Sequence, residues 1–153
     1  MMSLMQDFPL TLQMVMRHAQ EQFPEREVVS LLEDGSVHRA TYAECFARAG
    51  RLANVLGELG VQRGDRIATL AWNHYRHFEL YYGISCSGAV CHTLNPRLFS
   101  DQIEYIVNDA SDSWIFTDPD FLPVIEPIID KLPSVKGVVV LADENYAYQG
   151  TLA

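Results

Sequence analysis

The sequence contains no apolar run long enough to cross a bilayer. Its N-terminus lacks the basic segment and long apolar run of a secretion signal. The three cysteines, Cys45, Cys86 and Cys91, form no CxxC pair and have apolar neighbours, which indicates buried, reduced thiols rather than a disulfide framework. These absences predict a soluble cytoplasmic protein without a transmembrane segment.

Positive charge is scarce: 11 lysines and arginines face 20 aspartates and glutamates, which gives a formal net charge of −9. The imbalance lies in residues 101–153, which carry 10 acidic and 2 basic groups, whereas residues 1–100 carry 10 and 9. Nucleic acids and anionic membranes would be repelled by this acidic half, so we exclude them as partners. A solvated acidic face is the simplest interpretation of the charge.

The common nucleotide-binding motifs are also missing. No GxGxxG is present, so a dinucleotide site is unsupported. Residues 83–88 have the glycine spacing of a phosphate loop, but Ala89 and Val90 replace the required Lys and Ser/Thr. We interpret the small residues of this segment as allowing a helix to approach the sheet closely.

The segment 63–96 organises the rest of the chain. Residues 67–72 form a short apolar run, as expected for a strand covered on both faces. Residues 75–89 are apolar on most of a helical circumference, which predicts a buried helix. Residues 90–94 predict a second strand, stopped by Asn95 and Pro96. Such a strand–helix–strand unit is typical of a parallel sheet.

Before this unit, the pattern predicts two helices and a hairpin. Thr11 is expected to cap a helix with an apolar stripe, and Asp34-Gly35-Ser36 is expected to join two hairpin strands, residues 28–33 and 37–42. Thr41 and Glu44 match a capping box at the start of a helix that Gly60 closes. The stripe of the first helix is Leu12, Val15, Met16, Ala19 and Phe23.

After this unit, we predict a helix from Ser100, a strand over residues 114–117 and a helical stretch from Asp118 that Pro123 and Pro127 should break. A β-branched run over residues 137–141 predicts a last strand. The fold class is therefore α/β: an N-terminal helix and β-hairpin, then βαβ units in a mainly parallel sheet. We treat residues 1–153 as one partial domain, because no helix follows the last strand.

Several groups of residues invite a chemical interpretation. His74, His77 and Glu79 could hold a metal ion, but a solvated pair of histidines at a helix start is the commoner arrangement, so we predict no metal site. Cys91 and His92 are neighbours on a strand and point to opposite faces, which favours core packing over a nucleophile–base pair. Four aspartates could suggest carboxylate chemistry, but they lie around turns and helix caps, so we interpret them as ordinary turn residues: Asp109, Asp112, Asp118 and Asp120.

Four stretches of the sequence carry a resemblance to a known family: residues 40–44 (ATYAE), 60–68 (GVQRGDRIA), 83–96 (ending in GAVCHTLNP), and 101–110 (DQIEYIVNDA) followed by 114–118 (WIFTD). Together and in this order they resemble the AMP-forming acyl-CoA synthetases, within the adenylate-forming ligases, over about residues 8–142. Residues 72–75 (WNHY) together with 92–98 (HTLNPRL) resemble the members that act on medium- or long-chain fatty acids.

The resemblance implies an enzyme that uses ATP and Mg²⁺ to convert a fatty acid to an acyl-adenylate and then transfers the acyl group to coenzyme A. The phosphate loop, the adenine pocket, the ribose-binding aspartate and the catalytic lysine of the family do not occur here. We therefore assign no catalytic, cofactor-binding or metal-binding residue, and expect an inactive N-terminal fragment that binds none of these cofactors.

One substrate-pocket hypothesis remains, because Trp72, Asn73 and His74 follow a strand at the carboxyl end of the sheet. We predict that they line the acid pocket of the complete enzyme. The alternative is a small, non-catalytic α/β interaction module derived from the same family. We expect a homo-oligomer in either case, since an incomplete sheet leaves apolar surface exposed.

Overall fold

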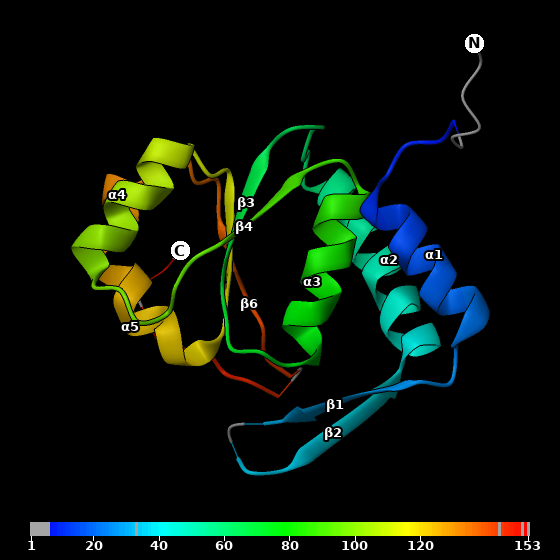
Figure 1. Ribbon diagram of the computed structural model, residues 1–153. Coiled ribbons are helices and arrows are strands. Elements are labelled where there is room, and N and C mark those ends of the chain that lie inside the picture. Colours follow the sequence, from blue (N-terminus) through cyan, green and yellow to red (C-terminus); the bar gives the residue numbers. More distant parts are fainter. Residues whose placement is uncertain (1–6, 33, 144, 151, 153) are drawn as a thin grey trace.

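A computed structural model describes residues 7–32, 34–143, 145–150 and 152. Figure 1 shows a parallel sheet between two helical layers, with a hairpin beside one of them. The sheet has the strand order β4-β3-β5-β6, which confirms the predicted α/β class and the parallel pairing. Its strands are β3 (Arg66–Leu70), β4 (Val90–Thr93), β5 (Trp114–Thr117) and β6 (Val138–Val140).

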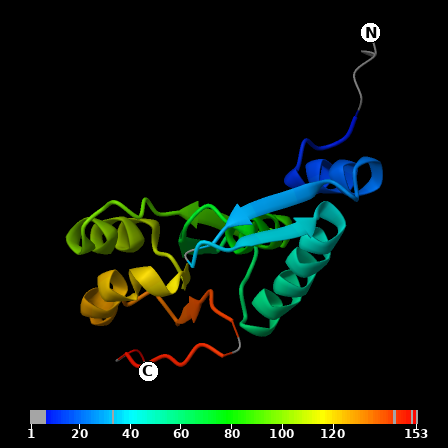
Figure 2. The same cartoon turned by 90° about the horizontal axis from the view of Figure 1, so that it is seen from below.

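Each face of the sheet has its own apolar core, as the alternation of strand side chains requires. On β3, Ile67 packs toward α2 (Tyr42–Glu58) and α3 (Tyr75–Cys86). Ala68 and Leu70 pack toward α4 (Ser100–Ala110) and α5 (Leu122–Ile125) on the other face. On β5, Phe116 and Ile115 divide between the two faces in the same way. Figure 2 shows the two helical layers from below, on opposite sides of the sheet.

Helix α2 (Tyr42–Glu58) begins at the predicted capping box. Thr41 Oγ1 accepts a hydrogen bond from the Glu44 N–H at 3.2 Å, and Glu44 Oε2 accepts one from the Thr41 N–H at 2.8 Å. These bonds satisfy two backbone donors that a helix start otherwise leaves free. Gly60 follows the helix with φ of +75°, which confirms the predicted left-handed termination.

Helix α3 (Tyr75–Cys86) lies between α2 and the sheet. A Cβ atom added at Gly83 would lie 2.6 Å from Leu52 Cδ2 and 3.1 Å from the Ala49 carbonyl oxygen, both on α2. The small residue therefore permits a close approach between two helices. Our interpretation of a close approach to the sheet was wrong at this position.

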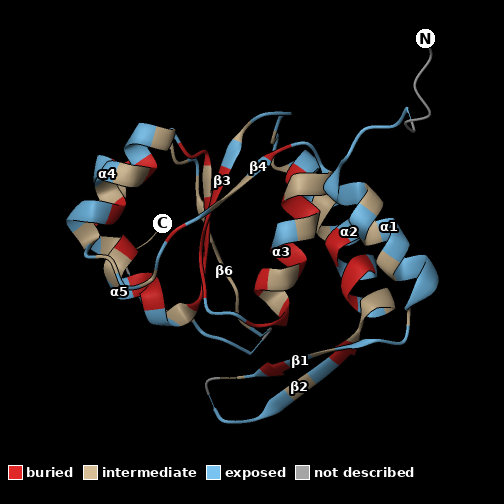
Figure 3. Cartoon of the chain, viewed as in Figure 1, coloured by how far each residue is buried: buried red, intermediate tan, exposed pale blue. Residues whose placement is uncertain are grey.

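Helix α1 (Leu12–Gln22) differs from the prediction in its packing. Thr11 occupies the N-cap position, but its side chain makes no capping hydrogen bond. Leu12, Val15 and Phe23 are about half exposed, while Met16 and Ala19 are partly buried. Figure 3 shows how little of α1 is covered. The predicted apolar stripe exists, but only part of it contacts α2 and α3.

The hairpin and the second helical layer agree with the prediction. Strands β1 (Glu27–Leu31) and β2 (Val37–Thr41) pair antiparallel, and Gly35 takes a φ of +81° in the turn. Glu33, at the expected end of the first strand, lies outside the described residues. On the far face, α4 (Ser100–Ala110) buries Ile103 and Val107 completely.

The proline-containing stretch after β5 is divided into short pieces, as its prolines predicted. It consists of η1 (Pro119–Phe121), α5 (Leu122–Ile125) and η2 (Glu126–Lys131), and Pro123 and Pro127 stand near the starts of the last two. In the described part of the chain, no helix combines the length and apolar character that a bilayer span needs.

Candidate functional site

The site begins where strands β3 and β5 end side by side. Leu70 and Thr117, at the ends of the two strands, are partners in the parallel ladder. From β3 the chain continues to α3 on one face, and from β5 it continues to α5 on the other (Figure 1). Neighbouring strands whose connections leave to opposite faces form a switch point, where α/β sheets commonly bind ligands.

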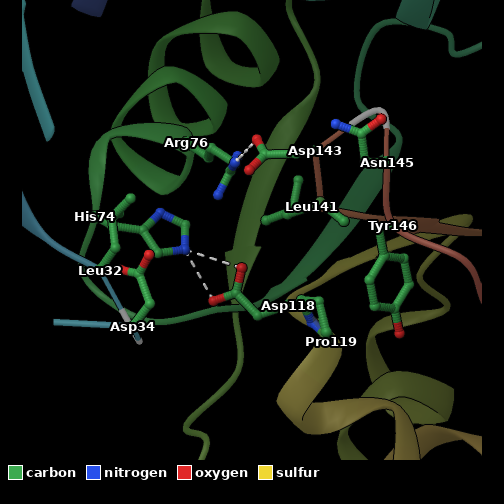
Figure 4. A pocket seen from close by; sticks show the side chains of 11 residues that line it. Leu32, Asp34, His74, Arg76, Asp118, Pro119, Leu141, Asp143, Asn145 and Tyr146 are labelled. Atoms are coloured by element: carbon green, nitrogen blue, oxygen red, sulfur yellow. Dashed lines mark hydrogen bonds and ion pairs between the residues drawn. The ribbon is translucent and has the colours of Figure 1, made fainter. Parts of the chain in front are cut away.

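A buried carboxylate occupies this switch point. Asp118 is 1% exposed and directly follows β5. Its Oδ2 accepts a hydrogen bond from the Trp72 backbone N–H at 2.7 Å, and both carboxylate oxygens lie 2.9–3.0 Å from His74 Nε2 (Figure 4). Asp118 therefore joins the segment after β3 to the segment after β5.

The hydrogen bonds also define the tautomer of His74. The His77 backbone N–H donates to His74 Nδ1 at 3.3 Å, so this nitrogen is the acceptor that caps α3. The proton must then reside on Nε2, which donates it to Asp118. The His74 ring thus links the Asp118 carboxylate to the start of α3 by one hydrogen bond at each of its nitrogens.

The second histidine of this group, His77, is 5% exposed. Because the Trp72 carbonyl oxygen can only accept, His77 Nδ1 donates to it at 3.2 Å, and Nε2 accepts from the Thr69 hydroxyl at 3.0 Å. Burial lowers the pKa of His77, which keeps the ring neutral near pH 7. The interpretation of His74 and His77 as solvated was wrong, because both rings are enclosed by their partners.

The three predicted pocket residues are placed differently. Trp72 is 42% exposed; its ring centroid lies 4.8 Å from that of Phe121, and its indole N–H donates to Asp120 Oδ2 at 3.1 Å. Asn73 is exposed to solvent. His74 is the member of the three that lines a cavity at this edge.

That cavity has a volume of about 360 Å³ and opens at the carboxyl edge of the sheet (Figure 4). Asp34, Asp118 and Asp143 supply negative charge, and Arg76, which forms an ion pair with Asp143, supplies positive charge. This acidic lining disfavours phosphate groups. The remaining lining residues are Leu32, His74, Pro119, Leu141, Ala142, Asn145 and Tyr146.

A second histidine–aspartate pair lies away from this cavity. Asp112 is fully buried, and its Oδ2 lies 2.8 Å from His92 Nδ1. Burial raises the pKa of Asp112, and the hydrogen bond from His92 opposes that effect. Asp112 and Asp118 are therefore buried partners of histidines, so interpreting them as ordinary turn residues was wrong.

The cysteines show no sign of a nucleophile. Burial raises the pKa of Cys91 to about 11, so the thiol is protonated near pH 7, and the His92 ring binds Asp112 instead. Cys91 packs against the apolar core on the side of α2 and α3, which agrees with its interpretation as a core-packing residue. Cys45, Cys86 and Cys91 are free thiols; Cys45 is buried as predicted, whereas Cys86 and Cys91 are only partly buried, so the prediction of buried thiols was wrong for these two. Within the described ranges, no group of three or more potential metal ligands comes together.

Comparison with known proteins points to one family. The family model described as "AMP-binding enzyme" matches residues 16–152. The chain is 46% identical to a medium-chain-fatty-acid–CoA ligase of Ectopseudomonas oleovorans, over 86% of this chain and 24% of the relative. It is also 46% identical to a long-chain-fatty-acid–CoA ligase of Thermus thermophilus, over 98% of this chain and 28% of the relative.

Solved structures give the same result. The N-terminal domain of FACL13 from Mycobacterium tuberculosis matches with a TM-score of 0.77 and 28% identity, over 85% of this chain and 33% of that domain. A fatty acyl CoA synthetase of the same organism matches with a TM-score of 0.76. The chain spans about a quarter of the length of the curated relatives that it matches.

Proposed function

Because this chain belongs to the AMP-binding enzyme family, we propose that it forms the opening part of a fatty-acid–CoA ligase. The support is its 46% identity to ligases named for medium-chain and long-chain fatty acids. Such a ligase joins the acid to ATP, releases pyrophosphate and passes the acyl group from the adenylate to the sulfur of coenzyme A.

The described residues are not assigned to the cofactors of that reaction. Mg²⁺ would neutralise phosphate charge during the first step, but the acidic cavity at the sheet edge is unsuited to phosphates. We therefore propose that ATP, Mg²⁺ and coenzyme A bind to parts of a complete ligase outside this chain.

The location of the protein in the cytoplasm remains a prediction.

Within this proposal, Trp72, Asn73 and His74 contribute to the wall of the acid pocket. The observation that supports this role is their position at the switch point, where Asp118 fixes the backbone of the segment. Trp72 offers apolar surface that a hydrocarbon chain can contact, and Asn73 offers an exposed amide.

The test is acid-dependent exchange between ATP and pyrophosphate by a complete ligase that contains this chain. Replacing Trp72 or Asn73 by alanine should raise the KM for the fatty acid by about tenfold and leave the KM for ATP within about twofold. Leu31→Ala, on the exposed hairpin, is the matched control. An unchanged acid KM in both variants would remove these residues from the pocket.

The chain of 153 residues alone should show no exchange, because the family's phosphate loop and catalytic lysine do not occur in it. Clear exchange by this chain would overturn that expectation. The alternative function is a self-contained, non-catalytic interaction module; the exposed apolar side chains of α1 favour the fragment over this module, because a self-contained domain covers such surface. A complete protein without acid-dependent exchange would support this alternative over the ligase.

A further inference from the structure

We propose that Asp118 is a positioning residue of the acid pocket, which holds segment 72–74 so that the Trp72 indole forms an apolar wall for the hydrocarbon chain of the substrate. This inference rests on the proposed function above. It concerns a residue that the sequence analysis treated as an ordinary turn aspartate.

The first step of the argument is the geometry of the carboxylate. Asp118 receives one hydrogen bond from the Trp72 backbone and one from the His74 ring, from two residues that lie 46 and 44 positions earlier in the chain. It is 1% exposed, so water cannot replace either donor at low cost. A carboxylate accepts both bonds at once, whereas an amide in its place offers one oxygen and two N–H groups.

The second step is the effect of an amide on His74. In Asp118→Asn, the amide nitrogen would face either the Trp72 N–H or the His74 Nε2–H, and each of these is a donor. His74 could accept from the amide only in its other tautomer. That tautomer would place a proton on Nδ1, which now caps α3 by accepting from the His77 N–H. The substitution therefore loosens the segment whichever way the amide turns.

The third step is the placement of the indole. Three contacts fix Trp72: its backbone N–H on Asp118, its indole N–H on Asp120, and its ring on Phe121. All three partners belong to residues 118–121, directly after β5. The indole remains 42% exposed, so it presents a rigid apolar surface rather than filling the core.

The fourth step is the type of ligand. The neighbouring cavity contains three aspartates and one arginine, which disfavours the phosphates of ATP or coenzyme A at this edge. The apolar surface of Trp72 suits the uncharged hydrocarbon chain of a fatty acid. Displacing the indole should consequently weaken binding of the acid and leave ATP binding unchanged.

The first experiment follows the indole directly. The chain has two tryptophans, and the second, Trp114, has a buried indole N–H without a hydrogen-bond partner among the described residues. Trp114→Phe therefore removes no hydrogen bond that the structure records, and it makes Trp72 the sole tryptophan. In this background, acrylamide quenching of Trp72 should increase about twofold in Asp118→Asn. Asp109→Asn, an exposed aspartate of α4, should leave quenching unchanged.

The second experiment measures kinetics in a complete ligase. Asp118→Asn should raise the KM for the fatty acid by about tenfold, with the KM for ATP changed by less than about twofold. Trp72→Ala should have a similar effect. If Asp118 acts through Trp72, the double variant with Asp118→Asn and Trp72→Ala should have the same KM for the fatty acid as Trp72→Ala alone. The reason is that Asp118→Asn then has no indole left to displace.

The outcomes separate this inference from the proposed function. If Asp118→Asn has the quenching and the fatty-acid KM of the wild type, the inference is overturned. It is also overturned if the fold-increases in the fatty-acid KM of Asp118→Asn and Trp72→Ala multiply in the double variant. If Trp72→Ala leaves the acid KM unchanged, the pocket assignment fails instead. Should Asp118→Asn not fold, Asp118→Glu provides the test, since it keeps a carboxylate but changes the distance of its oxygens from the Trp72 N–H and the His74 ring. Unchanged quenching and unchanged acid KM in Asp118→Glu then overturn the inference.

Discussion

Among single side chains, the buried histidine at the start of α3 gives a clear pH dependence. His77 is enclosed by Thr69 and the Trp72 carbonyl, and burial is the largest cause that lowers its pKa from the ordinary 6.5. The hydrogen bond to the Trp72 carbonyl opposes burial and raises the pKa, and of the nearby groups His74 lowers the pKa and Asp118 raises it. As the pH falls below 6.5, the unfolded chain binds a proton that the folded chain does not bind.

We therefore predict that the free energy of unfolding decreases below pH 6.5, by at most about 1.4 kcal/mol per pH unit for this single proton. The contribution of His77 should be constant above that range. His77→Gln should have a flatter dependence, measured by urea unfolding between about pH 5 and about pH 7.5. His18→Gln, on exposed α1, should keep the wild-type dependence, and an equal slope in wild type and His77→Gln would contradict the prediction.

The candidate site shows what a sequence can indicate about individual residues. Trp72, Asn73 and His74 were proposed as pocket residues from their position after a buried strand, which is a local feature, and His74 is the one of the three that lines the cavity. Asp112 and Asp118 were missed as histidine partners because their partners lie 20 and 44 positions away. Pairing across such distances depends on β5 lying beside β3, and the sequence does not specify this strand order.

Among helices and strands, the contact between α2 and α3 depends on one glycine. At Gly83, alanine would gain helix propensity of about 1 kcal/mol but would place a methyl group against Leu52 and the Ala49 carbonyl. Overpacking of this kind costs about 1–3 kcal/mol, and the backbone oxygen cannot move without shifting α2. Gly83→Ala should therefore lower the free energy of unfolding.

A matched control lies on the partner helix. Gly50 is inside α2, and a Cβ added there would meet no atom within 4 Å. Gly50→Ala should therefore stabilise the protein by about 0.5–1 kcal/mol. Chemical denaturation of both variants measures the difference. A stabilised Gly83→Ala would mean that the two helices are not packed as closely as the structure shows.

The helices and strands themselves were largely predictable because their signals are local. The capping box at Thr41, the turn at Gly35 and the breaks at Pro123 and Pro127 each depend on a few neighbouring residues. Packing was less predictable. The stripe of α1 indicated a helix correctly, but the pattern cannot tell whether another part of the protein covers it.

At the scale of the whole molecule, the start of α1 presents uncovered apolar side chains. We define the α1 patch as Leu10, Leu12 and Val15, which are 90%, 49% and 54% exposed and line a common shallow hollow. Contiguous exposed apolar surface of this kind commonly marks a site of association. Its presence agrees with the prediction that the chain self-associates, which stays a prediction.

The patch should make the 153-residue chain bind a solvatochromic apolar dye. Replacing Leu10 and Val15 by serine should reduce the dye signal by about half or more, because two of the three exposed apolar side chains that the dye can contact are then lost. Leu31→Ser, at an exposed hairpin position, should have a much smaller effect, since Leu31 lies apart from the patch. Equal signals from wild type and the double variant would show that the dye binds elsewhere, with the open edges of β4 and β6 as the next surfaces to test.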